Sequence, residues 1–323
     1  MSRADTLFVE NVNTIMKSNL DDYEMIVRPK WSDGTPAHTI KALHLVNTYD
    51  LSKDVIPIMT LRKQGIKNAI DEILWIYQKK SSDIRDLKSH IWDQWTVKKS
   101  ETDIYTIGRA YGYQIGLHHR HHVYDGKEDL SRYPSATANQ DIRDMKTWVY
   151  MDQLDAVRWD LMNNPSSRSI ITTMYAPADL TYMGLKPCAF QMQYNVTIDA
   201  QGDMVLNAVL YQRSQDMLTA NNWNVIQYAA LINMLAREAG MKVGKFTHFI
   251  ADAHIYDRHI PLVEEMCEAY HQFNLHDGDD IPHPNPTVWI NPDVKSFYDY
   301  TVDDFKLEDY EYEEFNHKIE VAV

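Results

Sequence analysis

The chain has 323 residues, of which 44% are hydrophobic and 24% charged, and its formal net charge is −14. These proportions are typical of an ordinary globular protein that is long enough to bury a sizeable core. The acidic balance argues against a general nucleic-acid binder or a protein of the membrane surface, since both need a basic face, but a local arginine cluster could still bind a small anion.

The N-terminal half of the chain alternates helical patterns with loops. Apolar residues at helical spacing across residues 7–16 predict an amphipathic helix rather than a signal peptide. A loop rich in Pro, Gly and Asp follows and contains Arg28. Residues 64–79 and 140–162 carry apolar side chains at steps of three or four, which predicts two further helices. Because no apolar run approaches the length of a membrane span, we expect a cytoplasmic protein.

The C-terminal half combines strand and helix patterns. The segment IITTMY predicts a short strand, and residues 188–211 alternate apolar and polar side chains around the turn DAQGD, which predicts a β-hairpin. Residues 223–239 predict a buried helix that ends before Gly240. FTHFIADAHIY predicts another strand, PLVEEMCEAYHQF another helix, and more strands are expected before the tail IEVAV. Without an internal repeat or linker, the pattern predicts one α/β domain with a mixed sheet over residues 1–323.

Two cysteines lie far apart in the sequence, which suggests a reducing compartment and no disulfide framework. Cys188 follows Pro187 at the mouth of the predicted hairpin, where a thiol is open on one side. It is therefore either a nucleophile or a buried core thiol, the commoner fate of a free cysteine. Cys267 lies in the middle of a predicted helix and is expected to be structural.

One acidic residue interrupts an apolar helical stripe. Glu72 shares the stripe with Ala69, Trp75 and Ile76, at helical spacings of three and four. A carboxylate among apolar side chains can be desolvated, which raises its pKa and suits it to general acid–base catalysis. The alternative is a glutamate at the boundary of the core with its carboxylate in water.

Three arginines stand in or beside predicted loops. Arg213 and Ser214 end the second strand of the hairpin, and Arg28 and Arg168 lie in loops. A guanidinium matches the oxygens of a phosphate, so this set predicts an anion site. The alternative is that each arginine is solvated or paired with a carboxylate.

Two histidine-containing segments raise the question of a metal. His118 and His122 are four residues apart and could ligate a metal, although a polar surface loop is the other interpretation. ADAHIYDRHI offers Asp252, His254, Asp257 and His259, as a metal-dependent hydrolase would require. On a strand, however, Asp252, His254 and Tyr256 face the same side, so they could equally hydrogen-bond one ligand.

Taken in order, ten segments resemble the thymidylate synthase family. They are DEILWIYQ, HIWDQW, AYGYQ, NNPSSR, LKPC, LYQRSQDM, NNWNVIQYAALINMLA, ADAHIYDRHI, WINPDVKSFYDYTVDDFKL and the terminal VAV. The resemblance runs from the arginine loop to the last residue. It implies a homodimer of α/β subunits packed through their sheets. It also implies methylation of dUMP at C5, with 5,10-methylenetetrahydrofolate as carbon donor and reductant, giving dTMP and dihydrofolate.

The resemblance assigns the reacting groups. Cys188 matches the nucleophile that adds to C6 of the uracil and makes C5 reactive. Arg213 matches an arginine beside it, which should lower the pKa of the thiol. Glu72 matches the glutamate that acts through water on proton transfers and on the uracil O4, and Tyr111 matches the tyrosine near the proton-transfer water. Asn224 matches the residue that reads the uracil edge, for which an amide offers both a donor and an acceptor.

The resemblance also assigns the binding residues for the two small molecules. Arg168 should reach the phosphate from the other subunit, which would make the dimer necessary for activity. The expected dUMP site comprises Arg28, Arg168, Arg213, Ser214, Gln212, Asn224, His254 and Tyr256. The expected folate site comprises Ile91, Trp92, Asp216 and Val323, the last as the end of a tail that closes over both ligands.

Several residues depart from the pattern of the family. Ser169 stands where most members have a second arginine, so one phosphate contact could be missing or replaced by a hydroxyl. Ala189 follows the nucleophile in place of histidine. Ala220 and Trp223 stand where Gly and Phe are usual. The usual lysine of the folate-tail region corresponds to Arg62 or Lys63.

Three alternatives remain on the sequence alone. A nucleotide hydroxymethylase of the same fold would let water attack the methylene group in place of hydride. Asn224 argues against the dCMP version, and Trp92 and the terminal VAV argue against the dUMP version because both would exclude water. A metal-dependent hydrolase would use the His and Asp residues of ADAHIYDRH. A non-catalytic nucleotide-binding protein would need neither Cys188 nor Glu72.

Overall fold

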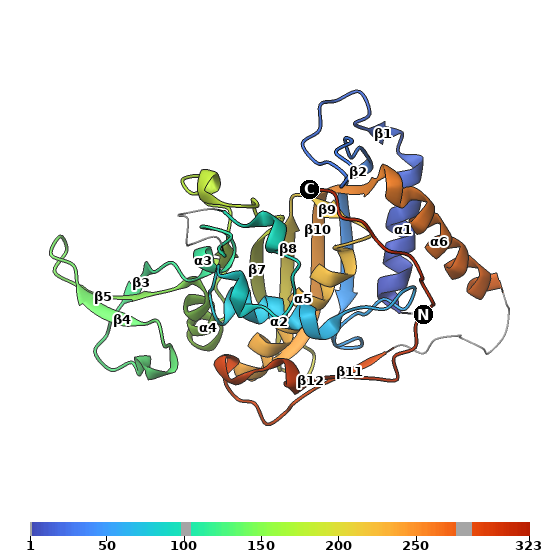
Figure 1. The fold of residues 1–323 in the computed structure, drawn as a ribbon. Helices are drawn as coiled ribbons and strands as arrows, with labels where there is room; N and C mark the ends of the chain where they lie inside the picture. The colour runs from blue at the N-terminus through green and yellow to red at the C-terminus, as the bar shows by residue number, and fades with distance from the viewer. Residues whose placement is uncertain (1, 98–104, 276–285) are drawn as a thin grey trace.

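A seven-stranded mixed sheet forms the centre of the molecule in the computed structural model, which describes residues 2–97, 105–275 and 286–323 (Figure 1). Along the sheet the order is β1 (Leu20–Asp21), β2 (Thr39–Asp50), β10 (Lys242–Tyr256), β8 (Met204–Gln212), β7 (Ala189–Ile198) and β6 (Ile170–Thr173), and β9 (Gln215–Asp216) pairs with β10. β10 runs parallel to β8 and antiparallel to β2, so the sheet is mixed. The predicted α/β class and the predicted hairpin β7–β8 are confirmed.

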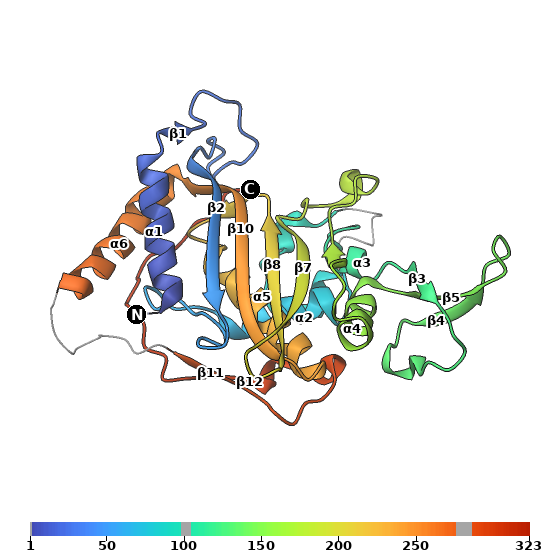
Figure 2. The same cartoon turned by 180° about the vertical axis from the view of Figure 1, so that it is seen from behind.

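Helices cover one face of this sheet. α5 (Asn221–Glu238) is buried along most of its length and packs against β8, β10 and α2 (Ile66–Tyr77). α1 (Arg3–Lys17) and α6 (Ile260–Leu275) pack together beside β2. Seen from behind, β10, β8 and β7 carry no helix (Figure 2). Within the described ranges, none of the helices has the length and apolar character needed to cross a bilayer.

The directions of the strands bring several chain segments to one edge of the sheet. Ala189 at the start of β7 pairs with Gln212 at the end of β8, and Gln212 pairs with Ile250 towards the end of β10. Tyr256, the last residue of β10, pairs with Thr39 at the start of β2. The loops before β2 and β7 and after β8 and β10 therefore meet at this edge, which Figure 1 also shows beside the C-terminus.

The region 119–151 differs from the sequence prediction. It forms a three-stranded antiparallel sheet of β3 (His119–Val123), β5 (Thr147–Met151) and β4 (Thr137–Gln140), which extends from the main body (Figure 1). The helix predicted over residues 140–162 is therefore wrong before α4 (Gln153–Asn163). Val149 and Met151 are buried at strand spacing, and β-branched and aromatic residues favour a strand there. Asp152 then caps α4 by accepting the N–H of Asp155 at 2.9 Å.

The histidine-rich segment is likewise a strand rather than the expected loop. His121 and His122 lie on β3, with a 2.8 Å contact between their Nδ1 atoms. His122 Nε2 lies 2.7 Å from Glu128 Oε2, and the ring stacks on Trp159. Among the described residues, the remaining α-helix is α3 (Gly112–Ile115), and the remaining strands are β11 (Thr287–Ile290) and β12 (Phe305–Glu308), which pair antiparallel.

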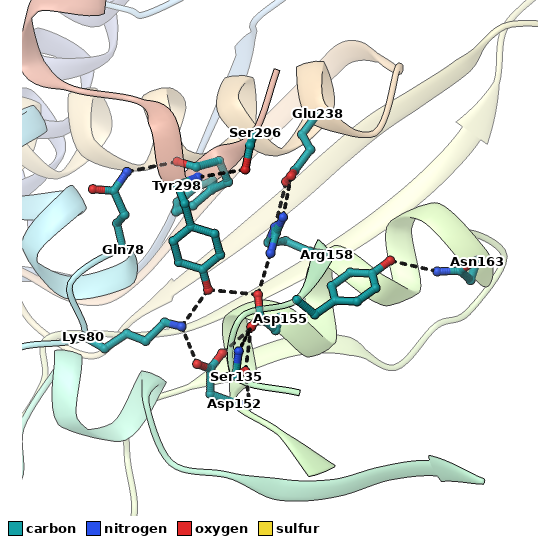
Figure 3. Close-up of polar contacts among 12 residues, drawn as sticks. Gln78, Lys80, Ser135, Asp152, Asp155, Arg158, Asn163, Glu238, Ser296 and Tyr298 are labelled. Atoms are coloured by element: carbon teal, nitrogen blue, oxygen red, sulfur yellow. Dashed lines mark hydrogen bonds and ion pairs between the residues drawn. The ribbon is translucent and has the colours of Figure 1, made fainter. Parts of the chain in front are cut away.

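A buried network of charged side chains fastens α4 to the core (Figure 3). The Arg158 guanidinium is 2% exposed and pairs with Asp155 at 2.6 Å and with Glu238 of α5 at 2.5 Å. Tyr298 donates to Asp155 at 2.9 Å and accepts from Lys80 at 2.7 Å. Burial opposes the charge of Arg158, but the two carboxylates outweigh it and raise the pKa of the guanidinium. The network thus joins α4, α5 and the C-terminal part of the chain.

Candidate active site

Cys188 is held by its backbone at the edge of the sheet. It is half-buried and directly precedes β7. Its carbonyl accepts the N–H of Arg213 at 2.9 Å, and its own N–H donates to Tyr111 Oη at 3.1 Å. These bonds tie the thiol to the end of β8 and to the start of α3. The expected position at the mouth of the hairpin is confirmed.

The guanidinium of Arg213 faces the thiol. Its Nη2 lies 3.5 Å from Cys188 Sγ, and it donates to the carbonyls of Lys186 at 2.8 Å and Pro187 at 3.1 Å. Burial raises the pKa of the Cys188 thiol, and the positive charges of Arg213 and Arg28 offset this only in part. The expected lowering by Arg213 is therefore present, but the raising effect of burial is larger, so the pKa of the thiol is raised overall.

Tyr111 has a strained backbone and a buried side chain. Its φ is 46° and ψ is −104°, a region that non-glycine residues rarely adopt. Its ring meets that of Trp92 edge to face, with 4.9 Å between centroids. Strain of this kind persists only where the surroundings enforce it, and here the conformation directs Oη to the N–H of Cys188.

Glu72 is buried on α2, with 6% of the residue exposed. Trp92 Nε1 donates to its Oε1 at 3.1 Å, and Trp223 Nε1 donates to its Oε2 at 2.8 Å. Burial raises the pKa of Glu72 to about 7, although both indole bonds act in the opposite direction. The expectation of a desolvated carboxylate is confirmed, and the alternative of a carboxylate in water is wrong. Trp223 was noted only as a departure, and nothing in the sequence indicated its bond to Glu72.

A chain of amides orients Asn224. Its Oδ1 accepts from Gln212 at 3.1 Å and Gln215 at 3.4 Å, and its Nδ2 donates to Gln227 at 3.0 Å. Gln212 Oε1 in turn lies 2.8 Å from His248 Nε2. Burial lowers the pKa of His248 to about 3, so its ring is neutral and donates to this oxygen. Gln215, Gln227 and His248 escaped the sequence analysis because their spacing along the chain carries no motif.

The ADAHIYDRHI segment engages partners within the protein. His254 Nδ1 lies 2.8 Å from Asp252 Oδ1, and its ring meets Tyr256 edge to face at 5.3 Å. Asp257 accepts from Trp31 at 3.0 Å, and His259 Nε2 lies 2.8 Å from the carbonyl of Glu320. Among the described residues, no group of three or more His, Cys, Asp or Glu side chains is arranged to hold a metal ion.

Of the other expected binding residues, Asp216 and Arg28 lie near Cys188, whereas Arg168 lies far from it. Asp216 lies on β9 at the same edge as Cys188, where its carboxylate accepts the N–H groups of Leu218 and Thr219. Arg28 is exposed in the loop before β2, close enough to influence the Cys188 thiol. Arg168 is exposed and precedes β6. Because Ile170 of β6 pairs with Tyr194 in the middle of β7, Arg168 lies away from the end of β7 that carries Cys188. Its guanidinium has no hydrogen bond or ion pair with another described residue of this chain.

The C-terminal tail lies beside the arginine loop. Val323 exchanges two backbone hydrogen bonds with Lys30, at 2.8 and 3.0 Å. Glu320 accepts from Ser32 at 2.8 Å and pairs with Arg258 at 3.3 Å. The tail therefore docks at the edge that carries Cys188, as Figure 1 shows by the position of the C-terminus.

Comparisons with known proteins show the family of the chain. A family model described as thymidylate synthase matches residues 7–323. The chain belongs to the thymidylate synthase family. It is accordingly a methyltransferase, and neither the hydroxymethylase nor the hydrolase alternative is favoured. The thymidylate synthase family uses 5,10-methylenetetrahydrofolate as its cosubstrate and binds dUMP.

The relatives of this thymidylate synthase family member include bacterial and phage proteins. The thymidylate synthase of Bacillus licheniformis is 37% identical over 321 residues, covering 97% of this chain and 96% of its own. The protein of Bacillus phage phi3T is 37% identical over 316 residues, with the same coverage. A solved structure, the thermostable thymidylate synthase A from Bacillus subtilis, superposes with a TM-score of 0.77 at 34% identity and covers 99% of both chains.

Proposed function

We propose that this protein converts dUMP to dTMP through a covalent bond between Cys188 Sγ and C6 of the uracil, with 5,10-methylenetetrahydrofolate giving dihydrofolate. One observation carries the proposal: Tyr111 joins the two groups that the chemistry needs. Its hydroxyl accepts the N–H of Cys188, and its ring packs on Trp92, which holds the carboxylate of Glu72. A nucleophile and a buried acid–base group therefore belong to one constellation.

The reaction needs a nucleophile because C5 of uracil is unreactive. Addition of the Cys188 thiolate to C6 converts the ring into an enolate, whose C5 then bonds to the methylene group of the cosubstrate. Loss of the C5 proton then expels the folate nitrogen, which breaks the C–N bond of the methylene group and leaves an exocyclic methylene on the ring. Hydride transfer from the tetrahydrofolate so released completes the methyl group and gives dihydrofolate. The Cys188–C6 bond then breaks, which returns the thiolate and releases dTMP and dihydrofolate. Glu72, with a pKa of about 7, can hold or release a proton at neutral pH.

Binding of dUMP is assigned to polar groups at this edge of the sheet. Arg28, Arg213 and Ser214 bind the phosphate, to which a guanidinium offers paired donors. The oriented amide of Asn224 reads the uracil edge, and Gln212 supports it through their 3.1 Å hydrogen bond. His254 and Tyr256 bind the deoxyribose hydroxyl.

Folate binding is assigned to a second set of residues at the same site. Trp92 is buried and Ile91 is partly exposed, so the two can pack against the cosubstrate and keep water from the reacting carbon. Asp216 binds the pterin ring. Val323, docked on Lys30, closes the site after both ligands have bound.

A second copy of the chain completes the phosphate site. The strands of the sheet expose Leu43 and Val46 on β2, Ile171 on β6 and Ile198 on β7, and Figure 2 shows a face without helices. Burial of such side chains favours association through the sheets. Arg168, which has no partner among the described residues of its own chain, would then reach the phosphate bound by the other subunit.

The test is a product analysis with a matched pair of variants. The protein is mixed with dUMP and 5,10-methylenetetrahydrofolate, and both products are identified by mass. We expect dTMP and dihydrofolate from the unaltered protein and from Cys267→Ser, but no product from Cys188→Ser, which should still bind dUMP. Hydroxymethyl-dUMP with tetrahydrofolate would show that water replaces hydride. Turnover by Cys188→Ser would remove the thiol from the mechanism.

A further inference from the structure

The carboxylate of Glu72 is held by indole groups from two different parts of the chain. Trp92 directly precedes a short 3-10 helix, Asp93–Trp95, and Trp223 lies in the first turn of α5. Each donates to a different oxygen of Glu72, and the bond from Trp223 is the shorter, at 2.8 Å against 3.1 Å. Two donors on separate elements fix the plane of a carboxylate more firmly than one.

The start of α2 leaves room for the indole of Trp223. Gly65 precedes α2 and lies seven residues before Glu72, which places both on one face of the helix, two turns apart. A Cβ added to Gly65 would lie 3.3 Å from Cζ3 of Trp223, a tight contact. The indole therefore lies along α2, with its six-membered ring over Gly65 and its N–H at Glu72.

We propose that Trp223 is a positioning residue for the reaction, whose indole N–H orients the carboxylate of Glu72 and stabilises its charged form. The inference rests on the proposed function, in which Glu72 takes part in proton transfer. A donor to a carboxylate favours the ionised state, whereas burial favours the neutral state. Trp223 therefore limits the effect of burial and keeps Glu72 able to exchange a proton near neutral pH.

The other titratable groups that face Glu72 do not supply this control. Asp71, on the same helix, acts against the charge of Glu72. Tyr111, before α3, and Tyr228, on α5, have pKa values raised well above the usual value by burial, so both are neutral across the working range of pH. The hydrogen-bond donors that lower its pKa are Trp223, Trp92 and Gln227, in that order of effect, and Trp92 is also assigned to the folate site.

The test is the pH dependence of kcat for Trp223→Phe, which keeps an aromatic ring and removes the N–H. Loss of a hydrogen bond to a charged group raises the pKa of Glu72, and the limb of the profile that Glu72 controls moves to higher pH by about one to two units. The limb moves to higher pH whether Glu72 acts as a base or as an acid, because in both cases its position follows the pKa of Glu72. The dissociation constant for dUMP should change less than about twofold, since the ring of Phe still fills most of the space.

Three comparisons make the result specific. Trp289→Phe removes an exposed indole on β11 and should leave the profile unchanged. In a Glu72→Gln background no carboxylate titrates, so adding Trp223→Phe should cause no further shift. Gly65→Ala keeps Trp223 but crowds its ring, so it should shift this limb of the pH profile in the same direction by a smaller amount. If Trp223→Phe does not fold, Gly65→Ala provides the test in its place.

The outcomes separate this inference from the function on which it rests. An unaltered protein that forms no dTMP would refute the proposed function. An active protein whose Trp223→Phe profile keeps its limb, or loses rate equally at every pH, would refute the role of Trp223. A shift that persists in the Glu72→Gln background would place the effect on another group and would equally overturn the inference.

Discussion

The hydroxyl of Tyr111 should be needed to hold the nucleophile, and Tyr111→Phe removes that hydroxyl alone. Phe can keep the edge-to-face contact with Trp92, so the main loss is the acceptor for the N–H of Cys188, at 3.1 Å. A buried donor without a partner costs about 1–3 kcal/mol. Because this bond is only partly buried, we expect the lower half of the range, about 1–2 kcal/mol, which corresponds to roughly a 5- to 30-fold lower kcat.

The assay must separate the anchoring of Cys188 from any part that Tyr111 plays in proton transfer. Alkylation of the thiol by iodoacetamide needs no folate and no proton transfer to the nucleotide, and a Cys267→Ser background removes the second thiol. We expect Tyr111→Phe to alter the alkylation rate at each pH as well as kcat. Tyr113→Phe, whose ring faces Arg109 instead, is the matched control. An unchanged alkylation rate would refute the anchoring argument, even if kcat falls.

Three further results are expected. Cys188→Ser should abolish dTMP formation while calorimetry still detects dUMP binding. Deleting Val323 removes two backbone bonds to Lys30, so kcat should fall by roughly tenfold with little change in dUMP binding. Arg158→Met removes the positive charge that pairs with the buried carboxylates of Asp155 and Glu238, and should lower the free energy of unfolding in urea by about 3–5 kcal/mol. Arg143→Met, with a side chain that is 81% exposed, should cost under about 1 kcal/mol.

Local patterns were sufficient to predict the elements that build the edge of the sheet. The alternation after Cys188 predicted β7 and β8, and the continuous apolar run before Gly240 predicted α5, because burial on all faces leaves a distinct pattern. The failure lay at residues 140–151, where apolar spacing suited a helix. There the pairing of β5 with two neighbouring strands decided the structure, and such long-range pairing is invisible in a local window.

The burial of Glu72 was predictable from the sequence, whereas the balance of effects on Cys188 and the contact from Trp223 were not. The apolar neighbours of Glu72 along α2 indicated desolvation, and the structure confirms it. Arg213 was expected to lower the pKa of Cys188 and it does, but the sequence did not reveal that burial has the larger, opposite effect. The bond from Trp223 to Glu72 joins positions 151 residues apart, so no sequence pattern could reveal it.

The thiol of Cys188 and the carboxyl group of Glu72 have opposite requirements in the same surroundings. Low polarity raises the pKa of both Cys188 and Glu72, which suits a carboxyl group that must exchange protons near neutrality but opposes formation of a thiolate. Arg213 and Arg28 favour the thiolate, whereas the indole N–H groups act on the carboxylate alone. An arginine beside Glu72 would lower its pKa and remove its ability to hold a proton. Neutral donors at Glu72 and charged donors at Cys188 therefore let one apolar site contain both groups.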